Sequence, residues 1–194
     1  MKVIKAKTAG FCFGVKRAVD TVYKQVDTKC GQIYTYGPII HNEEVIKDMR
    51  DKGVIVLRSE EDLDMISQGT VIIRSHGVEK RIYEKIEQKG LRIVDATCPF
   101  VKKIHNIVSE KSGEGFHIII IGNPEHPEVV GIKGWAKDNV TVIQSAEDAE
   151  CFKADRKEKI CIVSQTAFNY NKFKDLVEKF EKKGYDILVL NTIC

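Results

Sequence analysis

Short apolar runs alternate along the chain with stretches in which apolar residues recur every three or four positions. The stripe of Val15, Ala18, Val19, Val22 and Val26 predicts a helix over residues 14–27. Further helices are expected at residues 43–52, 79–89 and 100–111, after Ser59, after His126, and along a last stripe of Phe173, Leu176, Val177 and Phe180. Strands are expected at residues 2–7, 33–36, 54–57, 71–73, 91–94, 116–121, 140–143, 160–163 and 185–190. Because strands alternate with helices, we expect an α/β fold of parallel sheets covered by helices.

A turn that contains a cysteine occurs twice in the same setting. Cys12 and Cys98 each follow a predicted strand and precede a predicted helix, and both begin the pattern Cys-x-x-Val-Lys. A turn with a histidine, at His41 and at His126, follows each cysteine at nearly the same spacing. A third cysteine, Cys194, follows the last predicted strand. The repeat therefore predicts that Cys194 opens a third module, which is missing here.

Later turns repeat in the same order. The turn at His76 in the first half matches the turn at Thr166 in the second half, and each half closes with a helix, a glycine and a strand. We therefore expect repeated parallel-sheet modules, the first at residues 13–97 and the second at residues 98–194.

Charge and cysteine content narrow the classes of function. The 31 Lys and Arg residues nearly balance the 28 Asp and Glu residues, so the net charge of +3 does not favour binding to nucleic acid or to a membrane. The apolar runs are far shorter than the roughly 20 residues of a membrane span. Six cysteines in a chain without a recognisable secretion signal indicate a reducing cytoplasmic location, where thiols serve metal binding or catalysis.

The candidate chemistry collects in the turns that follow strands. Ligands of parallel α/β sheets bind beyond the carboxyl ends of the strands, where helix amino-termini favour phosphate. Imidazoles there can add hydrogen bonds or positive charge to an anion. Three distant thiols without a Cys-x-x-Cys pair do not fit a zinc finger or a thioredoxin motif, but they can hold three corners of an iron–sulfur cluster. Residues expected at this edge are Cys12, His41, His76, Cys98, His126, Thr166 and Cys194.

Glu128 is the best-placed acid, since it follows the turn histidine His126 by two positions. Its alternative interpretation is a first-turn glutamate that the helix dipole favours. Asp95 and Asn191 each precede a cysteine by three positions and are expected to accept hydrogen bonds from turn amides. Cys161 lies in an apolar run and is expected in the core.

Three further residues have expected roles in the structure only. We expect His105 and His117 to be structural and Trp135 to serve packing. The remaining cysteines, Cys30 and Cys151, have no counterpart in the repeat and no expected role.

As a set, these motifs resemble the IspH/LytB family of 4-hydroxy-3-methylbut-2-enyl diphosphate reductases. They occur in the family's order along the whole chain: Ala9-Gly10-Phe11-Cys12-Phe13-Gly14-Val15, His41-Asn42, Arg74-Ser75-His76-Gly77, Asp95-Ala96-Thr97-Cys98-Pro99, Glu125-His126-Pro127-Glu128 and Asn191-Thr192-Ile193-Cys194. The resemblance implies a three-module trefoil around a [4Fe–4S] cluster.

The resemblance also implies a role for each candidate residue. The metal ligands are Cys12, Cys98 and Cys194. The substrate diphosphate is held by His41, His76 and His126, while Glu128 delivers protons with help from the Thr166 hydroxyl.

The implied reaction removes the allylic hydroxyl of the substrate by reduction and yields isopentenyl and dimethylallyl diphosphates. This is the last step of the methylerythritol phosphate route to isoprenoids. The implied partner is an electron donor of the ferredoxin or flavodoxin type.

The resemblance ends with the chain, since family members continue for another module. In the family, the strand and cysteine turn at residues 1–12 belong with that third module. We therefore expect the chain as given to be an incomplete form of the enzyme. The alternatives are a non-catalytic truncated relative and an anion-binding α/β module that uses the histidines without a metal.

Overall fold

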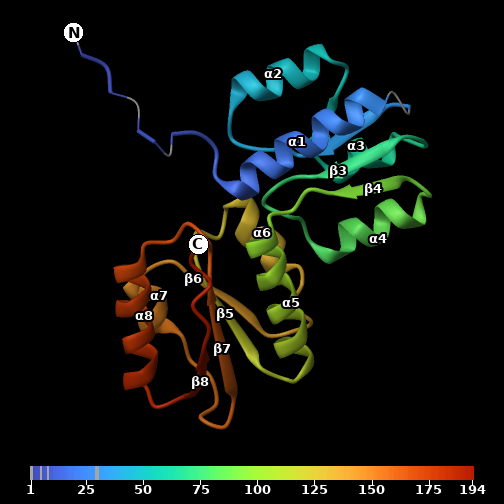
Figure 1. Ribbon diagram of the computed structural model, residues 1–194. Coiled ribbons are helices and arrows are strands. Elements are labelled where there is room, and N and C mark those ends of the chain that lie inside the picture. The colour runs from blue at the N-terminus through green and yellow to red at the C-terminus, as the bar shows by residue number, and fades with distance from the viewer. Residues whose placement is uncertain (1, 5, 8, 29–30) are drawn as a thin grey trace. The chain divides into compact units, whose positions relative to one another are not determined.

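The computed structural model describes residues 2–4, 6–7, 9–28 and 31–194. The chain divides into two compact units, each with one sheet (Figure 1). Unit 1 comprises Met1–Ser75 and Gly90–Cys98, and unit 2 comprises His76–Lys89 and Pro99–Cys194.

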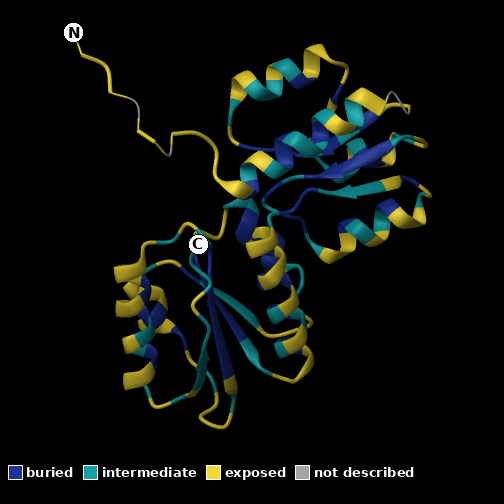
Figure 2. Cartoon of the chain, in the orientation of Figure 1, coloured by how far each residue is buried: buried dark blue, intermediate teal, exposed yellow. Residues whose placement is uncertain are grey.

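Unit 1 is built on a parallel sheet with the strand order β2-β1-β3-β4. Its strands are β1 (Ile33–Tyr36), β2 (Ile55–Leu57), β3 (Thr70–Ile73) and β4 (Arg92–Asp95). Its helices are α1 (Phe13–Thr28), α2 (Glu43–Asp51) and α3 (Glu60–Asp64). Helix α1 packs through its predicted stripe, because Ala18 and Val22 are buried in one apolar cluster with Ile33 and Ile72. Figure 2 shows β3 buried along its length, as expected for an inner strand.

Unit 2 repeats this strand order as β6-β5-β7-β8, again all parallel. Its strands are β5 (His117–Ile121), β6 (Val140–Ile143), β7 (Lys159–Ser164) and β8 (Asp186–Val189). Its helices are α4 (Lys80–Gln88), α5 (Pro99–Gly113), α6 (Pro127–Lys133), α7 (Ala146–Cys151) and α8 (Tyr170–Lys182). The predicted α/β class with parallel sheets is confirmed.

Strand β5 is apolar at successive positions because helices cover both of its faces. Ile119 and Ile121 lie in the apolar cluster that includes α8, whereas Ile118 and Ile120 lie in the cluster that includes α5 and α6. Successive side chains of a strand point to opposite faces, so a strand covered on both faces must be apolar at every position.

Helix α4 belongs to unit 2, although β3 before it and β4 after it belong to unit 1. The indole Nε1 of Trp135 donates a hydrogen bond of 2.9 Å to the carbonyl of Val78, directly before α4. A Cβ atom at Gly134 would lie 2.4 Å from the Cβ of Glu79, so only glycine permits this approach. The chain therefore passes between the units after Ser75, after Lys89 and after Cys98.

One expectation about secondary structure was wrong, and one helix was not predicted. The described part of residues 2–7 forms no strand, and Val3 and Ile4 are 80% and 78% exposed. A strand needs a neighbour for its backbone hydrogen bonds, and the described residues offer none there. Helix α7 was not predicted, although Ser145 and Asp148 form a reciprocal capping box at its start.

The other boundaries agree with the predictions to within one or two residues. Among the residues that the structure describes, no helix has the length and apolar character needed to cross a membrane.

Candidate functional site

Two cysteine turns lie in unit 1. Cys12 directly precedes α1, and its carbonyl accepts a hydrogen bond of 2.9 Å from the amide of Lys16. Cys98 directly follows the turn after β4, and its amide donates a hydrogen bond of 2.9 Å to the carbonyl of Ser75. Both thiols are free, that of Cys12 being exposed and that of Cys98 half-buried. Their positions match the predicted setting between a strand and a helix, except that the strand before Cys12 is absent from the described residues.

Gly14 allows the Cys98 thiol to lie against the first turn of α1. A Cβ atom at Gly14 would lie 2.5 Å from the Sγ atom of Cys98, which is closer than real contacts allow. The Arg17 guanidinium adds a second link, since it donates hydrogen bonds to the carbonyls of Thr97 at 2.9 Å and Asp95 at 3.4 Å. The helix that begins after Cys12 and the turn that ends in Cys98 are thus fixed to each other within unit 1. Neither Gly14 nor Arg17 was predicted to have a role.

Replacement of Gly14 by Ala is expected to lower the free energy of unfolding by about 1–3 kcal/mol, because the new methyl group overpacks the contact with Cys98. Urea denaturation followed by circular dichroism measures this change. The control is Gly113→Ala at the end of α5, where a Cβ atom meets nothing within 4 Å. The control should be neutral or slightly stabilising, and equal effects of the two substitutions would contradict the prediction.

The third cysteine turn, in unit 2, resembles the turn before Cys98. The Oδ1 atom of Asp95 accepts a hydrogen bond from the amide of Thr97 at 2.9 Å, and that of Asn191 accepts one from the amide of Ile193 at 3.1 Å. The predicted capping of turn amides by these two side chains is confirmed. The amide of Cys194 itself donates a hydrogen bond of 2.9 Å to the carbonyl of Thr166.

Glu128 is a buried acid in the first turn of α6. The residue as a whole is only 3% exposed. Its Oε1 accepts a hydrogen bond of 2.6 Å from the Thr166 amide, and its Oε2 lies 2.7 Å from the Thr166 hydroxyl, which donates to it. Burial raises the pKa of Glu128 above its ordinary value, and the two hydrogen bonds from Thr166 oppose this shift. The carboxyl therefore retains its proton to a higher pH than an exposed glutamate does.

The raised pKa of Glu128 predicts a specific dependence of stability on pH. An acid with a higher pKa in the folded state stabilises that state below its unfolded pKa, near 4.5, and this contribution is lost as pH rises through the folded pKa. We expect the unfolding free energy of the wild type, minus that of Glu128→Gln, to decrease as pH rises above about 4.5. Urea titrations of both proteins across this range measure the difference. A difference that grows with pH would instead mean that the bonds from Thr166 outweigh burial.

Two of the three candidate histidines lie together in unit 2. The rings of His76 and His126 meet edge to face, with their centroids 5.5 Å apart. The Nδ1 of His126 accepts a hydrogen bond of 3.1 Å from the amide of Glu128 and so caps α6. A neutral ring that accepts through Nδ1 carries its proton on Nε2, which makes that atom a donor. His41 is exposed in the turn before α2 of unit 1.

The unit 2 residues form a connected series. His126 is bonded to the backbone of Glu128, the Glu128 carboxyl to Thr166, and the Thr166 carbonyl to the backbone of Cys194. The hydrogen bonds thus link an imidazole, a buried carboxyl and the backbone of a cysteine. In unit 1 the geometry joins Cys98 to the helix that follows Cys12.

The remaining candidates are accounted for as follows. Cys161 is fully buried in an apolar cluster, and burial raises the pKa of its thiol to about 11, so its predicted place in the core is confirmed. His105 is buried and stacks on Trp135, and His117 is hydrogen-bonded to Glu158 and Thr141. Cys151 is an exposed free thiol, and Cys30 lies outside the described residues.

Comparison with known proteins supports one family for the whole chain. The model of the family described as LytB protein matches residues 3–194. A 4-hydroxy-3-methylbut-2-enyl diphosphate reductase of Thermoanaerobacter sp. (strain X514) is 46% identical over 196 residues, covering all of this chain and 67% of that protein. The reductase of Clostridioides difficile (strain 630) is 42% identical, and 69% of its length is covered.

Solved structures agree with these sequence relatives. The E-1-hydroxy-2-methyl-but-2-enyl-4-diphosphate reductase of Plasmodium falciparum superposes with a TM-score of 0.89 at 30% identity, over 97% of this chain and 59% of that one. A second structure, described as the terminal enzyme of the non-mevalonate pathway, gives a TM-score of 0.84 at 38% identity, over 99% of this chain and 68% of that one. The chain thus spans about two thirds of the length of its relatives.

Proposed function

The chain belongs to the LytB protein family, and we propose that it carries most of the active site of a 4-hydroxy-3-methylbut-2-enyl diphosphate reductase. The proposed reaction replaces the allylic hydroxyl of the substrate by hydrogen. It consumes two electrons and two protons, releases the hydroxyl as water, and leaves isopentenyl or dimethylallyl diphosphate. The observation that carries the proposal is the buried Glu128 carboxyl, held by both the amide and the hydroxyl of Thr166.

Glu128 has the properties that proton delivery to a leaving hydroxyl requires. Its raised pKa keeps a proton on the carboxyl in conditions where an exposed glutamate has lost it. The hydrogen bonds from Thr166 fix the direction of the carboxyl group, which preserves its alignment with a substrate. We assign Glu128 as the proton donor and Thr166 as the residue that positions it.

The histidines suit the diphosphate of the substrate. His126 presents Nε2 as a donor because Nδ1 is engaged with the backbone of α6, and His76 lies against the same ring. Hydrogen bonds from imidazole N–H groups to phosphate oxygens orient the substrate without requiring positive charge. We assign His41, His76 and His126 to diphosphate binding.

The three cysteines fit a [4Fe–4S] cluster with three protein ligands. Thiolates are the usual ligands of such clusters, and each of these residues offers a free thiol that is not buried in the core. Gly14 leaves room for the thiol of Cys98 beside the start of α1, which a side chain would occupy. When bound, the cluster supplies electrons and an iron coordination position that no thiolate fills. We assign Cys12, Cys98 and Cys194 as ligands and a ferredoxin- or flavodoxin-type protein as the electron donor.

The test is anaerobic reconstitution of the protein with iron and sulfide, followed by an assay with a chemical reductant. We expect the full-length protein to be brown and to convert 4-hydroxy-3-methylbut-2-enyl diphosphate into the two C5 diphosphates. A protein that stays colourless and inactive after reconstitution would overturn the proposal.

A further inference from the structure

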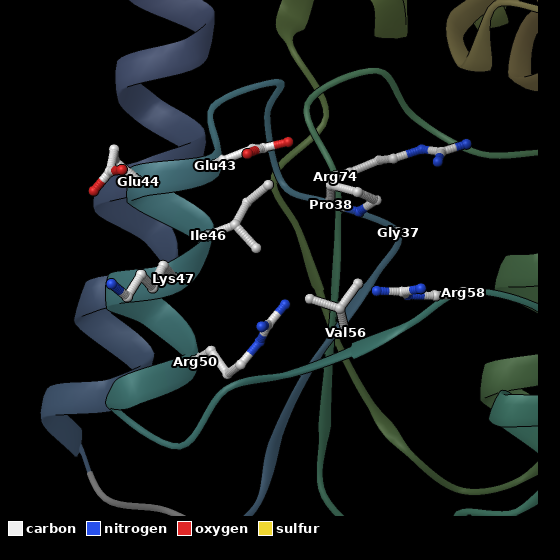
Figure 3. Close-up of a pocket in the computed structure, with 10 residues that line it drawn as sticks. All are labelled: Gly37, Pro38, Glu43, Glu44, Ile46, Lys47, Arg50, Val56, Arg58 and Arg74. Atoms are coloured by element: carbon white, nitrogen blue, oxygen red, sulfur yellow. The ribbon is translucent and has the colours of Figure 1, made fainter.

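Unit 1 contains a pocket of about 530 Å³ that shares no lining residue with the site proposed above (Figure 3). It lies where strands end and helix α2 begins. Gly37, Arg58 and Arg74 directly follow β1, β2 and β3, and the pocket's other wall comes from α2. The lining residues are Gly37, Pro38, Glu43, Glu44, Ile46, Lys47, Arg50, Val56, Arg58 and Arg74. Its volume is that of a site for a small molecule.

The two charged side chains that face each other across this pocket are positive. Figure 3 shows the guanidinium groups of Arg50 and Arg58 directed toward each other across Val56, while the side chains of Glu44 and Lys47 point away from Val56. Within the described part of the chain, neither of these two guanidinium groups has an ion-pair partner. Two facing cations repel each other, and an anion between them removes that repulsion and gains charge-assisted hydrogen bonds. Two acidic residues, Glu43 and Glu44, also line the pocket, and Figure 3 shows Glu43 at the end near Pro38 and Arg74, apart from Arg50 and Arg58.

The turns that carry the arginines are fixed by hydrogen bonds. The amide of Arg58 donates to the Asp62 carboxylate at 2.7 Å, and the amide of Gly37 donates to the carbonyl of Leu57 at 2.7 Å. Gly37 has a φ of 73°, and a Cβ atom there would lie 2.5 Å from the Nη1 of Arg74. Glycine therefore permits both the turn and the position of Arg74 across it. A prearranged rim of this kind reduces the entropy lost when a ligand binds.

Between the cations the surface is apolar. Pro38, Ile46 and Val56 line the pocket, and Figure 3 shows Val56 between Arg50 and Arg58 and Ile46 between Arg50 and Glu43. A bare inorganic anion would satisfy the arginines and leave this apolar surface in water. A ligand with an anionic head and an apolar body would satisfy both features.

We propose that this pocket binds a small organic phosphate with an apolar tail, whose head lies between Arg50 and Arg58 and whose tail covers Val56 and Ile46. No chemical step takes place there, and the pocket is a second anion site of unit 1. The choice of a prenyl diphosphate as probe rests on the proposed function, since the reaction proposed above yields such molecules. The anion site itself rests on the geometry of the pocket alone.

The experiment is calorimetric titration of the anaerobically purified protein with dimethylallyl diphosphate and, separately, with inorganic pyrophosphate. To separate the two sites, the titrations are carried out in the wild type and in a His76→Ala/His126→Ala background. In that background we expect binding of one dimethylallyl diphosphate per chain to remain. Adding Arg50→Gln and Arg58→Gln should weaken this binding at least tenfold, and pyrophosphate should bind severalfold more weakly than the prenyl ester.

The matched control is Arg156→Gln, which removes an exposed arginine of unit 2 and should change the affinity less than twofold. Circular dichroism melting confirms that each variant is folded, which is expected because the substituted arginines are exposed. The proposed binding site would be wrong if the two arginine substitutions left the affinity unchanged. It would also be wrong if millimolar dimethylallyl diphosphate showed no saturable binding in the His76→Ala/His126→Ala background. Equal affinity for pyrophosphate would overturn the role of the apolar surface. Failure of the proposed reductase activity would leave each of these outcomes intact.

Discussion

The variant Glu128→Gln is expected to lose about 10²–10⁴-fold in turnover, the range that general acid catalysis contributes, while it keeps the native fold. The fold should persist because the amide of glutamine imitates the protonated acid. Its oxygen can accept from the Thr166 amide, as Oε1 of Glu128 does at 2.6 Å, and its NH₂ group can donate to the Thr166 hydroxyl. What the variant lacks is a proton that it can release. Anaerobic turnover assays with a saturating chemical reductant measure the loss.

The matched comparison for this variant is Thr166→Val, which removes the hydroxyl but leaves the backbone amide that binds Glu128. The loss of turnover should be smaller for Thr166→Val than for Glu128→Gln, because the Glu128 carboxyl keeps its proton and one of its two hydrogen bonds. Its activity should also show a shifted pH profile, since a hydrogen bond that lowers the pKa of Glu128 has been removed. Turnover of Glu128→Gln within threefold of the wild type would show that protons arrive by another route.

The variant Cys98→Ser is expected to lose nearly all of its brown colour and all measurable turnover after reconstitution. A serine hydroxyl remains protonated at neutral pH and is a poor ligand for iron, so only two of the three proposed thiolate ligands remain. Visible absorbance, together with iron and sulfide content per chain, measures the loss. The backbone hydrogen bond from residue 98 to Ser75 does not involve the thiol and should persist.

The control for this variant is Cys151→Ser, which replaces an exposed free thiol at the end of α7. It should keep full colour and turnover. If Cys98→Ser turned over like the wild type and still bound phosphate, the anion-binding module without a metal would become the better interpretation.

The elements of the fold could be predicted because burial leaves periodic traces in the sequence. The continuous apolar run of β5 and the stripe of α8 each follow from the side chains that their neighbours cover. Helix α7 was not predicted because it buries only Ala149, so its sequence has no periodic stripe of apolar residues. The capping residues Ser145 and Asp148 are its one sequence signal. The described residues before Cys12 have alternating character without a partner strand, and alternation by itself does not form a strand.

The candidate residues of the site come from the sequence, but the contacts between them could not be predicted from it. The repeat places His126 and Thr166 in turns at the same edge of a sheet, and Glu128 follows His126 by two positions. The hydrogen bonds between Glu128 and Thr166 depend on β5 and β7 being neighbours in the sheet, and the sequence does not state that order. Gly14 shows the same limit. It was visible in the motif, but its importance comes from a Cys98 thiol that lies far away along the chain.

The placement of α4 has a consequence for the order in which the chain folds as it is synthesised. Domains generally fold from the N-terminus as they emerge. Strand β4 can complete the unit 1 sheet as soon as residues 92–95 have been made. Helix α4 is made earlier, yet the residues that hold its start, Gly134 and Trp135, emerge much later. The start of α4 therefore gains its contacts with Gly134 and Trp135 only after the sheet on either side of it in sequence can already have formed.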